Sequence, residues 1–275
     1  AGSGSVENPS ITIGEEEIKY NGTIKENGLL KIDTEKMTVV LDFGNALSFD
    51  GVDDKVNIPH NSVLNIQNVT LECWVYPISY TGYGTLVGKW LDGEDKRQYQ
   101  IAIKSDGTLR FDISDTGKWN AGYMTHTTEE FVPLNKWTHI AATYDGVEKK
   151  VYFNGAEKLS VDIDIDIYES DTDAYIGGYT TTVHDRYFNG LIDDVRIWNV
   201  ARTQQQIQDN MNKELTGNEE GLIGCWKFNE GNGFIVYDST ENGNDGTIHG
   251  ATWVDIATNT LANYEGGFPK LPPGN

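Results

Sequence analysis

The residues best suited to do chemistry lie in the stretch 188–199, which reads Phe-Asn-Gly-Leu-Ile-Asp-Asp-Val-Arg-Ile-Trp-Asn. Apolar and polar residues alternate after the Asn189-Gly190 turn signal, which predicts a strand. Three apolar residues share one face of this strand: Leu191, Val195 and Ile197. Asp193 falls on the same face, where a carboxylate is costly unless it is paired or binds a metal ion. Two interpretations remain open, a hydrogen-bonded carboxylate and a ligand of Ca²⁺.

A second set of carboxylates alternates with isoleucine at Asp162, Asp164 and Asp166. Two carboxyl groups about 5–5.5 Å apart can serve as acid and nucleophile in glycoside hydrolysis. Aspartates in this pattern also occur on the solvent-facing side of an edge strand, where charge prevents edge-to-edge pairing, and we favour this interpretation. The sequence has no Gly-x-Ser-x-Gly motif, phosphate-binding loop or Cys/His cluster. We therefore predict no catalytic residues and expect that the protein is not an enzyme.

Aromatic residues in the predicted loops could bind a sugar, because rings stack on C–H surfaces while planar polar groups bind hydroxyls. The predicted ligand-binding residues combine such rings with one arginine: Trp90, Tyr99, Trp119, Tyr123, Arg186 and Tyr187. Core packing is the alternative for any single ring, so the hypothesis is that the set clusters on one face. Four tryptophans in predicted strands are expected in the core: Trp74, Trp137, Trp198 and Trp226.

The charge balance limits the partners of the protein. Its 42 acidic and 21 basic residues give a net charge of −21, and a field of this sign disfavours nucleic acid and anionic lipid. No run of about 18 apolar residues occurs, so we expect no membrane insertion. The two cysteines, Cys73 and Cys225, both lie in apolar runs. Two buried thiols and a disulfide between them are the alternatives.

The elements that position these residues are predicted to be strands. Short runs rich in Val, Ile, Thr and Tyr are joined by Asp-Gly and Asn-Gly turns without alternating helices, which indicates an all-β, antiparallel two-sheet sandwich. One short surface helix is expected after Thr203, which forms a capping box with Gln206. We divide the chain into a linker (1–10), N-terminal strands packed on the sandwich (11–44), the main domain (45–256) and a C-terminal linker (257–275).

Five motifs occur in the order found in a known family. They are Ala-Leu-Ser-Phe-Asp-Gly-Val-Asp-Asp (46–54), the apolar run 71–77, Trp-Thr-His-Ile-Ala with Tyr-Asp-Gly (137–146), Tyr-Phe-Asn-Gly (152–155), and the stretch 188–198 with Ala-Arg-Thr (201–203). Together they resemble the laminin-G-like, concanavalin-A-like jelly-roll domains of extracellular proteins, over roughly residues 45–210. Segment 222–253 resembles the piece that flanks these domains.

The resemblance implies two antiparallel sheets, one of them concave, with a structural Ca²⁺ often held near the first and last strands. The residue types agree, because Asp50, Asp53 and Asp54 lie in one turn and Asp193 and Asp194 in a late strand, and Ca²⁺ prefers such hard oxygen ligands. A solvated acidic turn is the alternative. We predict that Asp50, Asp53, Asp193 and Asp194 meet in space and share the ion.

The expected function follows from the same resemblance. It is a lectin-like, non-catalytic, calcium-stabilised carbohydrate-binding module of a secreted or cell-surface protein, with a neutral polysaccharide or oligosaccharide as its partner. A protein-binding, adhesin or spacer domain of the same fold, with another extracellular protein as partner, is the alternative. A glycan-cleaving enzyme is a third, less favoured interpretation.

Overall fold

The computed structural model describes residues 44–180 and 186–256, together with the backbone of four short strands before residue 44. The chain divides into two units, Ala1–Leu41 and Asp42–Asn275. Two antiparallel strand pairs lie in the first unit: β1 (Val6–Glu7) with β4 (Thr23–Ile24), and β2 (Ser10–Ile13) with β3 (Glu16–Lys19). Segment 257–275 and most of segments 1–10 and 11–44 lie outside the described residues. The packing of 11–44 on the sandwich therefore stays a prediction.

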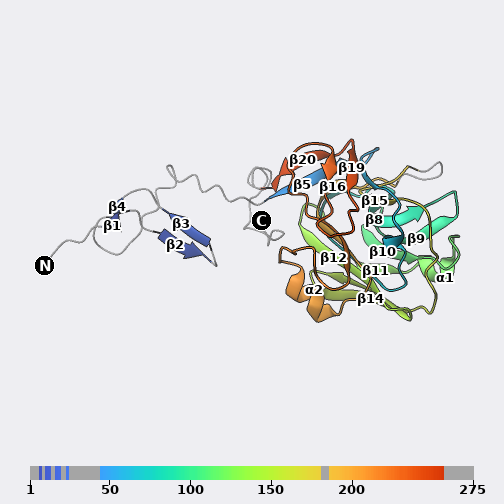
Figure 1. Ribbon diagram of the computed structural model, residues 1–275. Coiled ribbons are helices and arrows are strands. Elements are labelled where there is room, and N and C mark those ends of the chain that lie inside the picture. The colour runs from blue at the N-terminus through green and yellow to red at the C-terminus, as the bar shows by residue number, and fades with distance from the viewer. Residues whose placement is uncertain are drawn as a thin grey trace. The chain divides into compact units, whose positions relative to one another are not determined.

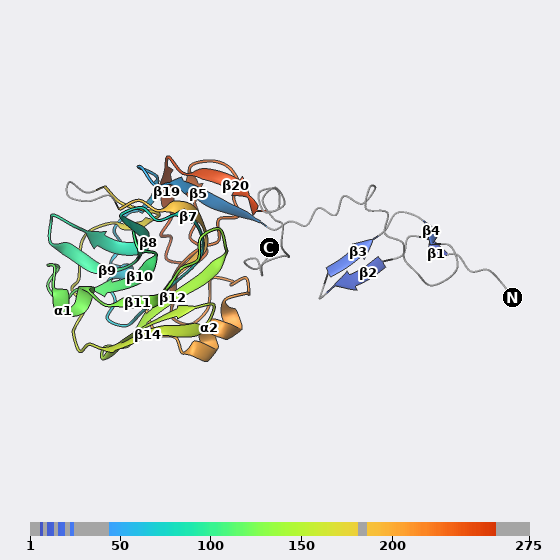
Figure 2. The same cartoon turned by 180° about the vertical axis from the view of Figure 1, so that it is seen from behind.

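The second unit consists of two antiparallel sheets in separate layers (Figures 1 and 2). Sheet I contains, in spatial order, β14 (Ala156–Asp162), β13 (Glu148–Phe153), β12 (Thr138–Tyr144), β7 (Val69–Ser79), β16 (Asn189–Trp198), β5 (Asn45–Asp50) and β20 (Thr252–Asp255), and β17 (Leu222–Trp226) also pairs with β16. Sheet II contains β11 (Thr127–Phe131), β10 (Thr108–Ile113), β9 (Lys96–Lys104), β8 (Tyr83–Leu91), β15 (Ala174–Ile176), β6 (Lys55–Ile58), β19 (Gly246–His249) and β18 (Ile235–Val236). The helices are η1 (Ser62–Leu64), α1 (Ala121–Met124) and α2 (Gln204–Asn210). The predicted all-β, antiparallel two-sheet architecture is confirmed.

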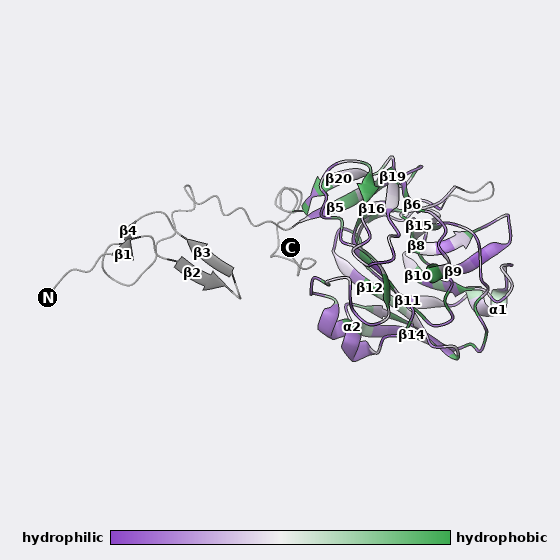
Figure 3. Ribbon diagram, in the orientation of Figure 1, coloured by the Kyte–Doolittle hydropathy of each residue, from purple (hydrophilic) through white to green (hydrophobic). Residues whose placement is uncertain are grey.

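The core lies between the two sheets and is built by alternation along the strands. Leu71, Cys73 and Val75 of β7 are buried in the same apolar cluster as Ile101 and Ile103 of β9. Apolar and polar colours are mixed along the strands of the sandwich, whereas α2 is largely hydrophilic (Figure 3). Full burial of one such side chain stabilises the fold by about 1.5–3 kcal/mol. Among the described residues, no helix has both the length and the apolarity needed to cross a membrane.

Helix α2 covers the outer face of sheet I. The Thr203 hydroxyl accepts a hydrogen bond from the Gln206 N–H, and the Gln206 side chain accepts one from the Thr203 N–H, so the predicted capping box is present. Ile207 is fully buried on the sheet side of the helix. Trp74 of β7 donates its indole N–H to the Met211 carbonyl at 2.8 Å, just past the end of α2. The helix is therefore tied to the sheet by both an apolar contact and a polar one.

Charged residues are buried beneath this cover. The Glu72 carboxylate lies 3.5 Å from His139 Nε2, 3.7 Å from Arg196 Nη1 and 3.5 Å from Arg202 Nε. Burial alone would raise the pKa of Glu72, but His139 and the two arginines outweigh it and hold that pKa below its usual value. Glu72 is therefore an ionised partner for the cations that α2 and its following loop cover.

The segment 162–167 corrects one detail of the expected strand. β14 ends at Asp162, so Asp164 and Asp166 lie beyond it, exposed to solvent. Instead of pairing with a neighbouring strand, this segment is fixed by Tyr144, whose hydroxyl exchanges hydrogen bonds with both the N–H and the carbonyl of Ile165. The aspartates form a solvated face, as we interpreted them, but only the first of them belongs to an edge strand.

The two cysteines are free and buried. Cys73 lies in the core between the sheets, whereas Cys225 packs with Trp198 in a separate cluster of sheet I. A disulfide is therefore not formed, and burial raises the pKa of both thiols, which leaves them unreactive.

The capping box gives a test of how α2 is anchored. Replacing Thr203 by alanine removes the side-chain acceptor for the first turn, and we expect the free energy of unfolding to fall by about 1 kcal/mol. Urea unfolding followed by tryptophan fluorescence measures it. The matched control, Gln205→Ala at an exposed position of the same helix, should change stability by less than about 0.5 kcal/mol. Equal effects of the two substitutions would contradict a specific role of the cap.

Candidate functional site

The outer face of sheet II carries a row of polar and aromatic side chains. Because Ile101 of β9 points into the core, its neighbours Gln100 and Ala102 point outward. Arg110 of β10 stands opposite Ala102, and Asp112 stands opposite Gln100. These residues therefore share the outer face, where loops before and after α1 partly cover them.

Arg110 of β10, Tyr83 of β8 and Trp119 of the loop after β10 form what we call the aromatic platform. The Arg110 guanidinium carbon lies 5.1 Å from the ring centroid of Tyr83 and 5.1 Å from that of Trp119. Arg186 extends the stack, because its guanidinium carbon lies 4.7 Å from the Tyr83 ring. The Trp119 residue is 51% exposed, so its indole is supported from one side and open to solvent. Each cation–π contact stabilises this arrangement by about 0.5–2 kcal/mol.

The cation at the centre of the platform is neutralised by its neighbour two residues along β10. Arg110 donates from Nε and Nη2 to the Asp112 carboxylate at 2.8–3.1 Å. The Gln100 amide also donates to Asp112 at 3.0 Å. Because Arg110 and Asp112 are both buried, this charge-assisted pair fixes the guanidinium plane beneath the two rings.

A second carboxylate, Asp92, organises the other end of the face. It accepts hydrogen bonds from Trp90 Nε1 at 3.1 Å, Arg97 Nε at 2.9 Å, Tyr179 Oη at 3.2 Å and Arg186 Nη2. Burial alone would raise the pKa of Asp92, but the charges of Arg186 and Arg97 and the hydrogen bonds hold that pKa below its usual range. Asp92 therefore stays ionised and fixes the arginine that supports Tyr83.

The predicted ligand-binding residues separate into two groups. Trp119 is exposed, and Tyr123 and Tyr187 are half-buried at the surface. Trp90 and Tyr99 are buried, which corrects the prediction that they contact a ligand: Trp90 bonds to Asp92, and Tyr99 donates its hydroxyl to the Leu64 carbonyl in the core.

Arg186 is likewise buried and pairs with Asp92, so its part in ligand binding stays a prediction. The sequence offered Tyr83 as a loop aromatic but the predicted set left it out, and Arg110 was not considered. The signal that could have found Arg110 is its i, i+2 spacing from Asp112, which places both charges on one face of a strand.

The loop that carries Trp119 leaves β10 after Ile113 and returns at the start of β11. Arg97 donates to the Gly117 carbonyl at 3.2 Å, and the Ser114 hydroxyl donates to the Lys118 carbonyl at 3.1 Å. Asn120 caps α1 by accepting from the Gly122 N–H at 2.9 Å. In both views α1 lies beside β9 and β10, on the other side of the sandwich from α2 (Figures 1 and 2). The loop is thus held by hydrogen bonds on both sides of Trp119.

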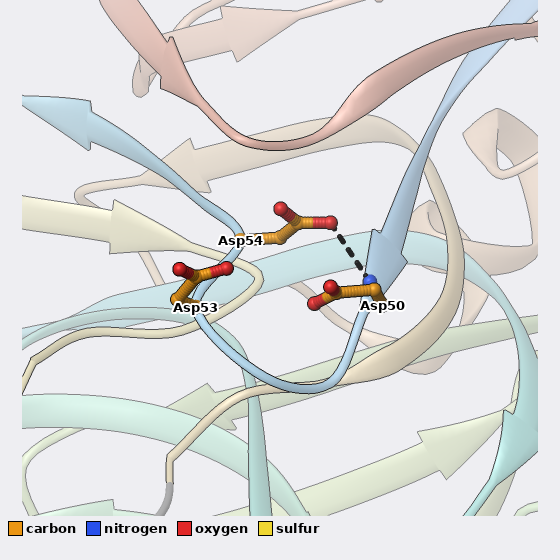
Figure 4. Close-up of side chains that lie close together, drawn as sticks. All are labelled: Asp50, Asp53 and Asp54. Carbon is orange, nitrogen blue, oxygen red and sulfur yellow. Dashed lines mark hydrogen bonds between the residues drawn. The ribbon is translucent and has the colours of Figure 1, made fainter.

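The acidic turn between β5 and β6 brings three carboxylates together. One oxygen from each of Asp50, Asp53 and Asp54 lies within 4.8 Å of the others (Figure 4). Asp54 is buried and accepts from the Asp50 N–H at 2.8 Å, while Asp50 accepts from the Val52 N–H. Gly51 permits the reversal with a φ of +80°. Burial, and then the charges of Asp50 and Asp53, raise the pKa of Asp54, so the turn concentrates negative charge.

Asp193 and Asp194 are not part of this group, which corrects the predicted four-carboxylate site. Asn189 of β16 stands opposite Asp50, and Asp193 is four residues further along the strand, about 13 Å at the usual rise. Asp194, at a bulge with φ of +48°, pairs through both oxygens with Arg196. Asp193 is buried and accepts from the Asp194 N–H at 2.8 Å. Burial, and then the charge of Asp194, raise the pKa of Asp193 well above its usual value.

The comparisons with known proteins agree with this architecture. The sequence profile of the concanavalin A-like lectin/glucanase superfamily matches residues 50–208, and the chain belongs to this superfamily. The resemblance inferred from the motifs is thereby confirmed. No curated protein sequence matches the chain.

Several solved structures are similar. A candidate carbohydrate-binding protein from Bacteroides ovatus is 23% identical with a TM-score of 0.64, over 78% of this chain, which spans 60% of that protein's chain. Domain 4 of an extracellular arabinanase from Geobacillus stearothermophilus, in complex with arabinotriose, is 26% identical with a TM-score of 0.47, covering 60% of this chain and 75% of that one. A carbohydrate-binding module of a Ruminococcus gnavus sialidase, bound to α2,3-sialyllactose, is 14% identical with a TM-score of 0.47, covering 61% and 98%. The similarity to the Bacteroides ovatus protein shows that the two chains share a fold.

The role of Asp92 predicts a pH dependence with a definite sign. A carboxyl whose pKa is lowered in the folded state contributes stability above its unfolded pKa of about 3.9, and this stability is lost as the pH falls through the lower folded value. We expect Asp92→Asn to lower the free energy of unfolding by about 3 kcal/mol at pH 7, because it leaves the buried Arg186 and the half-buried Arg97 poorly paired. The difference from the wild type should shrink below about pH 4.

Urea unfolding at several pH values between neutral and acid measures this difference. The matched control is Asp166→Asn, at an exposed carboxylate, which should show a small difference at every pH. A stability difference for Asp92→Asn that stays constant from pH 7 to pH 3 would rule out the ionised carboxylate as its cause.

Proposed function

We propose that this chain is a non-catalytic carbohydrate-binding module, and that the aromatic platform on sheet II is its binding surface. The observation that carries the proposal is the Trp119 indole, half-exposed and backed by the Arg110 guanidinium at 5.1 Å. A flat apolar ring with one open side is the surface on which a sugar ring stacks its C–H groups. Tyr123 and Tyr187 are half-buried rings whose hydroxyls bond to Asp115 and Thr180.

The charge distribution supports a neutral glycan as the ligand. Arg110 is paired with Asp112, and Arg186 with Asp92, so both guanidinium groups support rings and neither is an uncompensated anion site. The chain as a whole carries a net charge of −21, which repels polyanionic ligands. We therefore propose a neutral oligosaccharide or polysaccharide, of the kind met by proteins that are secreted or displayed at the cell surface.

An adhesion or spacer module that binds another extracellular protein is the second candidate. The observation that favours it is an exposed apolar edge at β18, where Phe234 is 76% and Tyr237 59% exposed. Large exposed aromatic groups of this kind occur at protein–protein contacts. Glycan binding that depends on Trp119 distinguishes the first candidate from this one.

Trp119→Ala tests the binding surface. A flat ring that stacks on one aromatic side chain contributes about 1–3 kcal/mol, so the affinity for a neutral oligosaccharide should fall about 5- to 100-fold. A glycan array identifies the ligand, and isothermal titration calorimetry then gives the dissociation constants. Phe131→Ala, at an exposed aromatic residue on the edge strand β11, should bind as the wild type does. Retained affinity in the Trp119 variant would reject this surface, and a wild type that binds no glycan would favour the adhesion module.

We also propose that the acidic turn binds Ca²⁺ through Asp50, Asp53 and Asp54. The support is that three carboxylates converge there and that Asp54 has a raised pKa caused in part by its two neighbours. Carboxylate oxygens are the ligands that Ca²⁺ prefers, and the ion would neutralise the repulsion that the turn contains. The ion would have a structural role, because it would fix the connection between β5 of sheet I and β6 of sheet II.

Calcium should therefore raise the melting temperature of the wild type. A hundredfold excess over the dissociation constant stabilises by about 2.7 kcal/mol, which corresponds to a shift of roughly 5 °C or more for a domain of this size. Differential scanning calorimetry with Ca²⁺ and then with EDTA measures the shift. Asp53→Asn should abolish the response, while Asp193→Asn should retain it. The same melting temperature with Ca²⁺ and with EDTA would contradict the site.

A further inference from the structure

Lys149 is a buried cation that links the two sheets. It lies on β13 of sheet I and is fully buried. Its ammonium group crosses to sheet II, where it donates to the Phe111 carbonyl at 2.9 Å and to the Tyr123 carbonyl at 2.5 Å. Lysine is rarely buried without a carboxylate partner, so the two backbone acceptors require an explanation.

The Phe111 carbonyl lies at an edge that no strand covers. The Leu109 N–H of β10 donates to the Thr128 hydroxyl of β11 at 3.1 Å. The backbone groups of every second residue in a strand point to the same side. The Phe111 peptide therefore also points toward the β11 side. β11 begins at Thr127, opposite Arg110, so it does not reach Phe111. Lys149 supplies the donor that a longer β11 would have supplied.

The Tyr123 carbonyl accepts from Lys149 and is also bonded by the side chain of His126. It belongs to the single turn of α1, Ala121–Met124. The last carbonyls of a helix receive no hydrogen bond from an N–H group of the helix itself. Phe111 precedes the loop 114–126, and Tyr123 lies near its return to β11. One ammonium group thus bonds to both sides of the base of this loop, and Trp119 lies between them.

We propose that Lys149 is a positioning residue that clamps the base of the loop 114–126 and so fixes Trp119 in the aromatic platform. The clamp acts from the opposite sheet and through the interior of the sandwich, without contact with the ligand. Its consequence for glycan affinity rests on the proposed function, whereas its effect on the loop does not. Burial lowers the pKa of Lys149 to about 8, with Asp112 opposing and Arg110 reinforcing the shift, so the group is mostly charged at neutral pH.

The chain offers a matched control in Lys89. This lysine is also fully buried and also donates to a main-chain carbonyl, that of Ser170, which lies outside the loop 114–126. Burial lowers its pKa to about 8 as well. Lys149→Met and Lys89→Met therefore remove the same chemical group from a similar environment, but only the first removes a bond to the loop that carries Trp119.

Hydrogen–deuterium exchange tests the clamp without any ligand. We expect the amides of 114–126 to exchange about tenfold faster in Lys149→Met than in the wild type, because the loop opens more often, while those of β12 stay unchanged. In Lys89→Met the loop should exchange within about twofold of the wild-type rate. Unchanged loop exchange in Lys149→Met, or equal acceleration in both variants, would overturn the proposal. If Lys149→Met does not fold, Lys149→Leu, which also removes the donor, takes its place, and failure of both to fold would also overturn the proposal.

Calorimetric titration with the neutral glycan that the wild type binds gives the second readout. Affinity should fall about tenfold in Lys149→Met and stay within about twofold in Lys89→Met. Faster loop exchange with unchanged affinity would overturn the link between the clamp and the platform. A wild type that binds no glycan, with the loop still loosened in Lys149→Met, would reject the proposed function and keep the clamp.

Discussion

The ion pair between Arg110 and Asp112 is the interaction on which the outer face of sheet II depends. A guanidinium group can lie between two aromatic rings and remain buried only if its charge is compensated nearby. Asp112 provides the compensation from the same strand, two residues away, so the pair forms without any contribution from a mobile loop. The Trp119 indole then has a rigid support on one side, which allows its other side to remain open to solvent.

The same spacing recurs in sheet I with a different result. Asp194 and Arg196 are also two residues apart and also form a buried pair, but there the arginine donates onward to the carbonyls of Asn210 and Lys213. The outer face of sheet I is thereby closed by α2 and the loop that follows it. Sheet II keeps an exposed ring at the corresponding surface. The two faces of the sandwich therefore use similar charge pairs, one to hold a cover and the other to hold a platform.

Much of the fold could be predicted from the sequence because its signals are local. Strand alternation, Asp-Gly and Asn-Gly turns and the Thr203–Gln206 capping box each depend on a few neighbouring residues. The positions of the site residues depend instead on which residues of distant strands pair with one another. Asp193 was expected beside Asp50, and only the pairing of Asn189 with Asp50 reveals that it lies four residues further along β16. The burial of Trp90 and Tyr99 depends in the same way on contacts with distant residues, which periodicity alone does not specify.

We propose that a neutral glycan binds at the open side of the Trp119 indole. Titration of the ¹⁵N-labelled protein with such a glycan, followed through the indole N–H resonances of its seven tryptophans, tests this most directly. We predict that the Trp119 resonance shifts with saturation while those of the buried Trp74 and Trp90 stay in place. Saturable binding that leaves the Trp119 resonance unmoved would show that the glycan binds elsewhere.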